Sequence, residues 1–95
     1  MDGSTIVNVV VPAPLRNYCG GAREFDLRAE TLREALVALE RLYPSLYAGV
    51  CDETGAIRRH INVFVNAAHI RDLQGLDARF VSGDVLTFLP AVSGG

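Results

Sequence analysis

The sequence predicts an α+β domain in which one mixed sheet of four or five strands packs against one main helix. Residues 31–43 carry the pattern of a long amphipathic helix, which must bury its apolar stripe against another element. Residues 5–11 read as a strand that is apolar on both faces, and further short strand patterns follow at 60–66 and 85–90. At 95 residues the chain is one domain, and its 49% hydrophobic residues suffice for one modest core.

Two strand patterns precede the helix. Thr5–Val11 is β-branched and apolar except for Asn8, so we expect a largely buried strand in the middle of the sheet. Pro12 ends it, because proline cannot donate to a strand ladder. Arg23–Leu27 alternates apolar and charged residues, and the turn-rich segment 17–21 before it predicts a hairpin between the two strands.

The helix is predicted over Thr31–Tyr43. Thr31 and Glu34 form a T-x-x-E capping box, in which each side chain accepts a hydrogen bond from a free amide at the helix start. Pro44 disfavours helical geometry at Tyr43 and ends the helix. Six residues recur at helical spacing as the predicted buried stripe: Leu32, Ala35, Leu36, Leu39, Leu42 and Tyr43. Residues 45–51 leave their structure open, with a short helical turn burying Leu46 and Val50 as one solution.

Three strand patterns follow the helix. His60–Asn66 alternates strictly, Ile70–Arg71 reads as a short edge strand, and Val85–Pro90 is the last strand. Residues 75–81 look irregular, and residues 91–95 have no pattern, so we expect a folded domain over 1–90 and a flexible tail over 91–95. The resulting order, β-β-α-β-β-β, is that of the β-grasp, or ubiquitin-like, fold.

Composition argues against several classes of function. A net charge of −2 offers no basic surface for nucleic acid, and no apolar run is long enough to cross a membrane. The first residues lack the pattern of a signal peptide, so we expect a cytoplasmic protein. Cys19 and Cys51 have no metal-ligand spacing and are expected to be reduced thiols, and His60 and His69 do not cluster with metal ligands. All nine basic residues are arginine, so the sequence contains no lysine that could capture an activated C-terminus.

The end of the chain carries a distinctive pattern. Residues 83–95 read G-D, a hydrophobic strand, proline, a short spacer and Gly94-Gly95, which resembles the end of the molybdopterin-synthase small subunit and of the thiamine-pathway sulfur carriers. The opening VNVVVPAPLR, the strand INVFVN and the ending LPAVSGG resemble the branch that supplies sulfur for cysteine or other thiometabolites. The chain is therefore identified as a member of the ubiquitin-like sulfur-carrier family of the MoaD/ThiS type.

This resemblance implies a chemistry in which the chain is a carrier and not an enzyme. An E1-like adenylating enzyme uses ATP to activate the carboxylate of Gly95, and sulfur from a persulfide donor of the rhodanese type displaces AMP to leave a thiocarboxylate. An acceptor synthase then receives the sulfur, and the carrier binds no cofactor itself. Some relatives extend beyond Gly-Gly and are trimmed by a JAMM-type zinc peptidase. This sequence ends at Gly95 and is expected to be competent as made, although such a peptidase could still release it from an adduct.

The tail suits delivery of a reactive group. Gly94 and Gly95 lack Cβ atoms, so their backbone can thread a narrow channel, and Pro90 fixes φ where the tail leaves the sheet. Val92 and Ser93 belong to the spacer between Pro90 and Gly94. An ordinary frayed terminus is the alternative on composition alone.

A docking face is predicted on the side of the sheet away from the helix. If Leu86 and Phe88 point to the helix, their neighbours on the strand point away. Four outward residues would then form an apolar patch beside the tail: Phe64, Leu89, Val85 and Val10. Scattered surface apolar residues are the alternative, and a slip of one residue in register would reverse a strand. Four arginines are candidates for pairing with an activating enzyme or for a solvated surface: Arg58, Arg59, Arg71 and Arg79.

Three classes of function remain open from the sequence. The first is a sulfur carrier, and the second is a ubiquitin-like modifier joined through Gly95 to lysines of other proteins. The third is a β-grasp interaction module with an inert tail. The pathway that receives the sulfur, whether molybdopterin, cysteine or another thiometabolite, also stays open.

Overall fold

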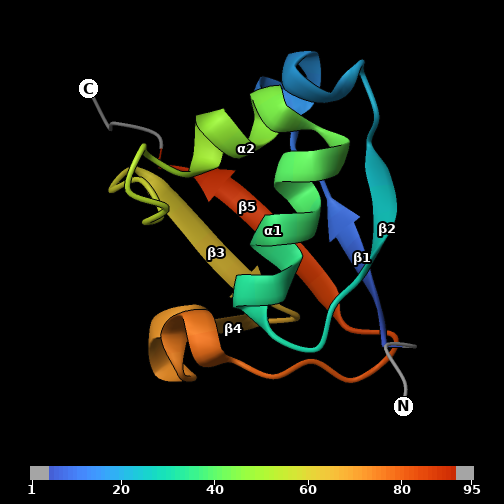
Figure 1. Cartoon of the computed structure of the whole chain (residues 1–95), viewed down its shortest axis with the longest axis vertical. Helices are drawn as coiled ribbons and strands as arrows, with labels where there is room; N and C mark the ends of the chain where they lie inside the picture. Colours follow the sequence, from blue (N-terminus) through green and yellow to red (C-terminus); the bar gives the residue numbers. More distant parts are fainter. Residues whose placement is uncertain (1–4, 92–95) are drawn as a thin grey trace.

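The computed structural model describes residues 5–91, which form one five-stranded sheet with two α-helices on one face (Figure 1). The strands lie in the order β2-β1-β5-β3-β4. Their bounds are β1 Ile6–Val10, β2 Glu24–Arg28, β3 Ile61–Val65, β4 Ala68–His69 and β5 Val85–Pro90. The helices are α1 Leu32–Leu42 and α2 Pro44–Val50, with short 3₁₀ helices η1 Ala13–Cys19, η2 Ile70–Asp72 and η3 Gly75–Asp77.

The centre of the sheet is a parallel pair formed by the first and last strands. β1 pairs with β5 in parallel and with β2 in an antiparallel hairpin, so β1 is an internal strand, as its apolar sequence predicts. β5 pairs on its other side with β3, antiparallel, and β3 pairs with β4. The predicted β-grasp fold is confirmed, with five strands rather than four.

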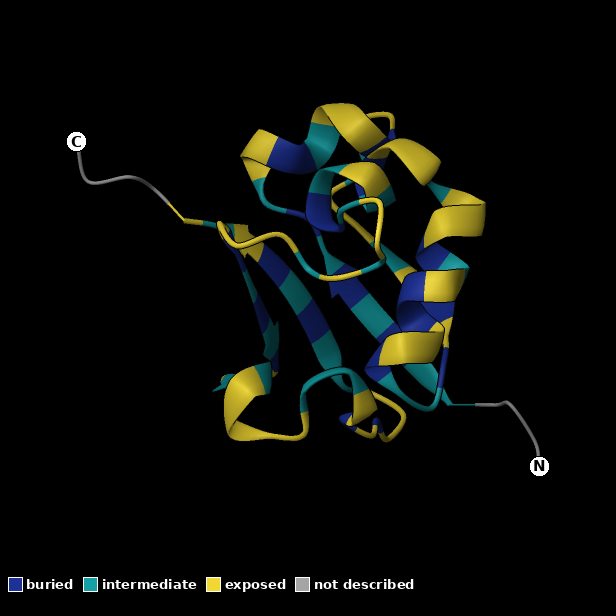
Figure 2. Cartoon of the chain, turned by 60° about the vertical axis from the view of Figure 1, so that its left-hand side comes forward, coloured by how far each residue is buried: buried dark blue, intermediate teal, exposed yellow. Residues whose placement is uncertain are grey.

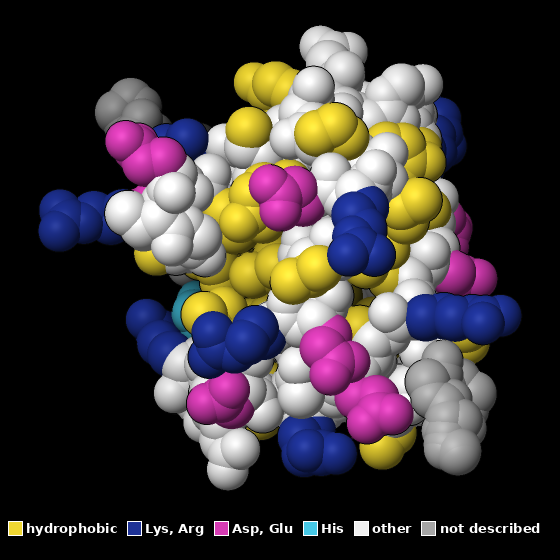
Figure 3. Space-filling view, viewed as in Figure 1, with side chains coloured by type: hydrophobic (Ala, Val, Ile, Leu, Met, Phe, Trp, Pro, Cys, Tyr) yellow, Lys and Arg dark blue, Asp and Glu magenta, His cyan; other side chains and the backbone are white. Residues whose placement is uncertain are grey.

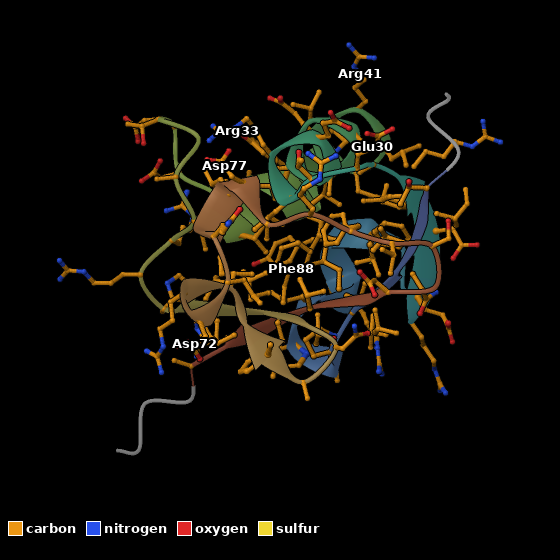
Figure 4. The ribbon with its side chains drawn as sticks, turned by 90° about the horizontal axis from the view of Figure 1, so that it is seen from below. Glu30, Arg33, Arg41, Asp72, Asp77 and Phe88 are labelled. Atoms are coloured by element: carbon orange, nitrogen blue, oxygen red, sulfur yellow. The ribbon has the colours of Figure 1, made fainter. Side chains whose placement is uncertain are left out.

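The core lies between the sheet and the helices. Buried residues alternate with more exposed ones along β1, β3 and β5, so each strand turns one row of side chains to the helix layer (Figure 2). Phe88 lies between the two layers and is 1% exposed (Figure 4). Leu32 and Leu39 of α1 are completely buried opposite the sheet.

One residue of the predicted helical stripe is misplaced. Leu42 is 56% exposed, so its assignment to the core is wrong. It is the final residue of α1, and Tyr43 leaves helical geometry with φ −139° and ψ 75° as the chain turns into α2. Tyr43 keeps partial burial by packing its ring on Phe25, with ring centroids 4.7 Å apart. At this end of the helix the apolar stripe therefore continues through Tyr43 and not through Leu42.

The start of α1 depends on side-chain caps. Thr31 Oγ1 accepts a hydrogen bond from the Glu34 amide at 3.2 Å. The Glu34 carboxylate accepts one from the amide of Glu30 at 2.9 Å, one residue before the position that a standard capping box uses. Both side chains thus satisfy amides at the helix start, as predicted.

Replacing Thr31 with Ala removes one of these acceptors. We expect the Thr31→Ala variant to lose about 1 kcal/mol of free energy of unfolding, measured by urea denaturation, because the Glu34 amide loses its partner. Thr31→Ser keeps the oxygen and is expected to retain most of that stability. Equal losses in the two variants would contradict a role for the hydroxyl.

Several segments between the main elements differ from expectation. Residues 44–50 form a full helix that completely buries Leu46 and Val50. The edge strand is Ala68–His69, so its prediction at Ile70–Arg71 is wrong. The Arg71 amide donates to His69 Nδ1 at 3.1 Å, which closes the turn of η2 where a strand was expected.

The segment 75–81 also gains order from the helix layer. Part of it is the 3₁₀ helix η3, and Arg33 of α1 forms an ion pair with Asp77 of η3 at 3.2 Å. Figure 4 shows these two side chains pointing toward each other. Both are largely exposed, so the ion pair orients this loop and adds little stability.

Candidate docking face and the root of the tail

The root of the C-terminal tail is held where the end of β5 pairs with the start of β3. Pro90 lies opposite Ile61 in the ladder, and the Ala91 amide donates a hydrogen bond to the carbonyl oxygen of His60. The chain therefore stays paired one residue beyond β5. Val92, Ser93, Gly94 and Gly95 lie outside the described residues, so their predicted roles stay predictions.

The strands turn their side chains to the predicted faces. Leu86 and Phe88 are buried toward the helices, at 0% and 1% exposure. The alternate residues point to the uncovered side of the sheet: Val10, Phe64 and Val85 are half-buried and Leu89 is 40% exposed. The assignment of faces is confirmed, and a register slip is excluded for these strands.

The register brings the predicted residues together around one residue that sequence reasoning left out. Thr87 of β5 lies opposite Val10 of β1 on one side and opposite Phe64 of β3 on the other. Val85 and Leu89 are the next outward residues of β5 on either side of Thr87. Neighbouring strands are about 4.8 Å apart, so the four apolar side chains surround the threonine. We call these five residues the open-face patch: Val10, Phe64, Val85, Thr87 and Leu89.

A small hydrogen-bonded cluster supports Phe64. His69 of β4 lies opposite Phe64, and their rings meet edge to face with centroids 5.1 Å apart. His69 Nδ1 accepts from the Arg71 amide, which leaves Nε2 to carry the proton and donate to Asn62 Oδ1 at 3.2 Å. The ring is thereby fixed in one tautomer and one orientation, and it limits the positions open to Phe64. Apart from an isolated histidine, nothing in the sequence indicates this contact.

The four candidate arginines have different surroundings. Arg58 donates from Nε to the carbonyl oxygen of Ala48 at 3.0 Å, which ties the turn at 52–58 to α2. A guanidinium nitrogen of Arg79 lies 3.9 Å from a carboxylate oxygen of Glu30, near the start of α1. Arg59 and Arg71 are exposed. Pairing of any of them with an activating enzyme stays a prediction.

The helix side of the molecule has a hollow of about 310 Å³ between α1, α2 and the turn at 52–58. Figure 3 shows this side, where apolar side chains are visible between scattered Arg, Asp and Glu side chains.

Hydrogen bonds from the hydroxyl and amide of Thr54 hold the pKa of Asp52 below its usual value, so the carboxylate organises its own turn. Among residues 5–91, no three His, Cys, Asp or Glu side chains are grouped to hold a metal ion.

Both cysteines are free and buried. Burial, with a smaller contribution from the charge of Asp52, raises the pKa of Cys51 from 9.0 to about 11. The thiolate is the reactive form, so this residue is an unreactive core thiol at neutral pH. Neither cysteine lies in the open-face patch, so nothing in their positions links the two thiols to docking.

The raised pKa predicts a loss of stability in alkali. In the unfolded chain the Cys51 thiol ionises near its ordinary pKa, whereas in the folded chain it stays protonated up to about pH 11. The stability that comes from keeping the Cys51 thiol protonated is complete below about pH 9, and it is lost as the pH rises from about 9 to 11. Urea denaturation across this range should show a decline that is smaller in Cys51→Ala. An identical decline in both proteins would contradict the assignment.

Comparisons with known proteins identify the family. Residues 9–95 match the sequence profile of the ThiS family. The chain belongs to the ThiS family. The sulfur carrier protein CysO of Mycobacterium tuberculosis is 33% identical over 91 residues, covering 94% of this chain and 98% of that protein. Its crystal structure superposes with a TM-score of 0.82 at 32% identity, over 90% of this chain and 99% of that one.

Two further solved structures extend the comparison. CysO in the Amycolatopsis orientalis BexX/CysO complex is 36% identical, with a TM-score of 0.84 and coverage of 94% of this chain and 99% of that one. SAMP1 of Haloferax volcanii is 29% identical, with a TM-score of 0.79 and coverage of 95% and 99%. These ThiS-type proteins are small carrier or modifier proteins with a ubiquitin-like β-grasp fold, and this chain is a protein of that kind rather than an enzyme. Within the described range, no helix is both long and apolar enough to span a bilayer.

Proposed function

We propose that this ThiS-family protein is a sulfur carrier that acts in the cytoplasm, where ATP is available. An E1-like enzyme adenylates the carboxylate of Gly95, and the acyl-adenylate becomes a thiocarboxylate. The observation that supports it is the position of the open-face patch on β5, the strand that leads into the Gly94-Gly95 end. The naming of its relatives as sulfur carrier proteins supports the same chemistry.

Three steps lead from the carboxylate to the thiocarboxylate, and none needs a base from the carrier. The carboxylate of Gly95 attacks the α-phosphorus of ATP, and pyrophosphate leaves. A persulfide sulfur then attacks the acyl carbon, and AMP leaves with the bonding electron pair. A second thiol then attacks the donor's sulfur atom in the resulting acyl disulfide, which releases the thiocarboxylate and leaves a disulfide between the two thiols. The carrier supplies the electrophile and its delivery, while the partner enzymes supply activation and the nucleophile.

The geometry supports delivery of the tail beside a docked partner. The hydrogen bond from the Ala91 amide to the His60 carbonyl fixes the starting point of the tail at the end of β5, beside the start of β3. Four residues follow Ala91, and four extended residues span at most about 14 Å. A partner seated on the open-face patch therefore has Gly95 within reach of an adjacent active site. The BexX/CysO complex supports the idea that such carriers bind partner proteins, and we propose the E1-like enzyme and an acceptor synthase as successive partners of this carrier.

Removing the aromatic ring from the patch tests the docking step. We expect Phe64→Ser to raise the KM for the carrier in ATP–pyrophosphate exchange by about tenfold or more, with kcat little changed, because a central aromatic contributes much of an interface's affinity. Val81→Ser is the matched control, because Val81 is 68% exposed and lies outside the patch. Equal KM values for the two variants, both confirmed as folded, would argue against docking through this face.

A protein modifier is the second candidate. SAMP1 and the small archaeal modifier protein 3 of Haloferax volcanii favour it, the latter at 34% identity over 65 residues, 68% of this chain and 70% of that protein. A modifier would join through Gly95 to lysines of other proteins, and a JAMM-type metallopeptidase would release it. Because this sequence has no lysine, adducts formed in an extract supplied with ATP should contain no chains linked through lysines of the modifier itself. Adducts on target lysines would favour the modifier over the carrier.

A further inference from the structure

Asn8 is the one polar residue in an otherwise apolar central strand, and the register explains its position. It points to the open face of the sheet, where it lies opposite Asp26 of β2 on one side and Val85 of β5 on the other. Its amide nitrogen donates to Glu24 Oε1 at 3.1 Å and to Asp26 Oδ1 at 3.2 Å. One neutral amide therefore holds two carboxylates beside the open-face patch. We call Asn8, Glu24 and Asp26 the acidic corner.

Within residues 5–91 neither of the two carboxylates forms an ion pair, although Arg28 is the next outward residue of β2 beyond Asp26. The two carboxylates belong to outward residues two apart on β2, so they lie about 7 Å from each other and repel. The ion pairs found within residues 5–91 join Arg33 to Asp77 and Arg79 to Glu30, and neither carboxylate of the corner takes part. Both side chains are exposed, and Asn8 orients them without neutralising them.

The acidic corner and the open-face patch form one continuous surface. Glu24 lies opposite Val10, and Val10 in turn lies opposite Thr87 at the centre of the patch. We propose that the E1-like enzyme carries an apolar surface flanked by an arginine, and that this arginine binds Glu24 and Asp26 while the apolar part covers the patch. This proposal rests on the proposed function. An arginine suits the site because its planar guanidinium presents several donors to carboxylate oxygens in charge-assisted hydrogen bonds.

Other occupants fit this surface less well. A second copy docked face to face would bring a second acidic corner to the same interface and add repulsion between carboxylates. The phosphates of a nucleic acid would also be repelled. A basic, partly apolar protein surface complements both halves of the face, and it fixes which way round the partner sits relative to the tail.

Charge-neutral variants test the proposal in ATP–pyrophosphate exchange with the E1-like enzyme of the source organism. Glu24→Gln with Asp26→Asn keeps oxygen acceptors for Asn8 and should preserve the fold. We expect a KM for the carrier about tenfold higher than wild type at low salt, and a KM that changes much less with added salt. Glu40→Gln with Glu53→Gln changes the net charge equally on the helix side and is expected to behave as wild type.

The outcomes separate the two proposals. If wild-type carrier is not adenylated at all, both the proposed function and this inference are wrong. If wild type is adenylated but both double variants change KM equally, the general charge of the carrier matters and the acidic corner does not. If the Glu24 and Asp26 variant keeps the wild-type KM and salt dependence, the inferred arginine is absent.

Discussion

Deleting Gly94 and Gly95 is expected to abolish sulfur loading by the E1-like enzyme and leave the fold intact. The reactive carboxylate would move to Ser93, where the chain is shorter and the new terminal residue carries a side chain. Both changes oppose entry into a narrow active site that accepts a glycine terminus. The described hydrogen bonds end at Ala91, so we expect the melting temperature to change by no more than a degree or two.

The measurement is AMP formation and loading in single-turnover reactions, with far-UV circular dichroism melts alongside. A Gly94→Ala variant keeps the length and the carboxylate of Gly95, and it should load more slowly than wild type but faster than the deletion. If the deletion variant kept full activity in its pathway, the tail would be inert, and the protein would be an interaction module.

Replacing Phe88 with Ala is expected to cost about 3–5 kcal/mol of free energy of unfolding, whereas Leu89→Ala costs less than about 1 kcal/mol. The two residues are neighbours on β5 with opposite orientations. Phe88 is 1% exposed between the sheet and the helices, so truncation leaves a cavity in the core. Leu89 is 40% exposed in the open-face patch, so truncation removes surface that we assign to a partner.

Urea denaturation and ATP–pyrophosphate exchange together separate these two effects. Phe88→Ala should lose stability while its folded fraction keeps a KM near the wild-type value. Leu89→Ala should keep stability and show a raised KM for the carrier. If Leu89→Ala instead lost stability and kept its KM, the open face would have a structural role, and docking would occur elsewhere.

Local chemistry made much of the fold predictable. The capping pair at Thr31 and Glu34 marked the start of α1, and strict alternation in β3 assigned Phe64 to the open face. In β5 the period of two assigned Leu89 to that face once Phe88 was taken as buried. These signals depend on residues close together in the chain, so they survive without knowledge of the tertiary structure. The apolar sequence of β1 likewise indicated a central strand.

The remaining features depend on contacts between segments that are distant in sequence. Thr87 sits at the centre of the patch only because β5 lies between β1 and β3, and a lone threonine gives no sign of that. Asn8 looks like a flaw in an apolar strand until β2 brings Glu24 and Asp26 beside it. The error at the edge strand has a local cause instead, because the His69 side chain accepts a hydrogen bond from the Arg71 amide and turns the chain.

The intact mass of the protein after incubation with its E1-like enzyme, ATP and a sulfur donor tests the central claim most directly. Fragmentation of the product assigns any mass change to a residue. We predict an ATP-dependent gain equal to the exchange of one oxygen for one sulfur, located on Gly95 and absent when Gly95 is deleted. An unchanged mass, or a sulfur located on Cys19 or Cys51 instead, would contradict the assignment of a C-terminal thiocarboxylate.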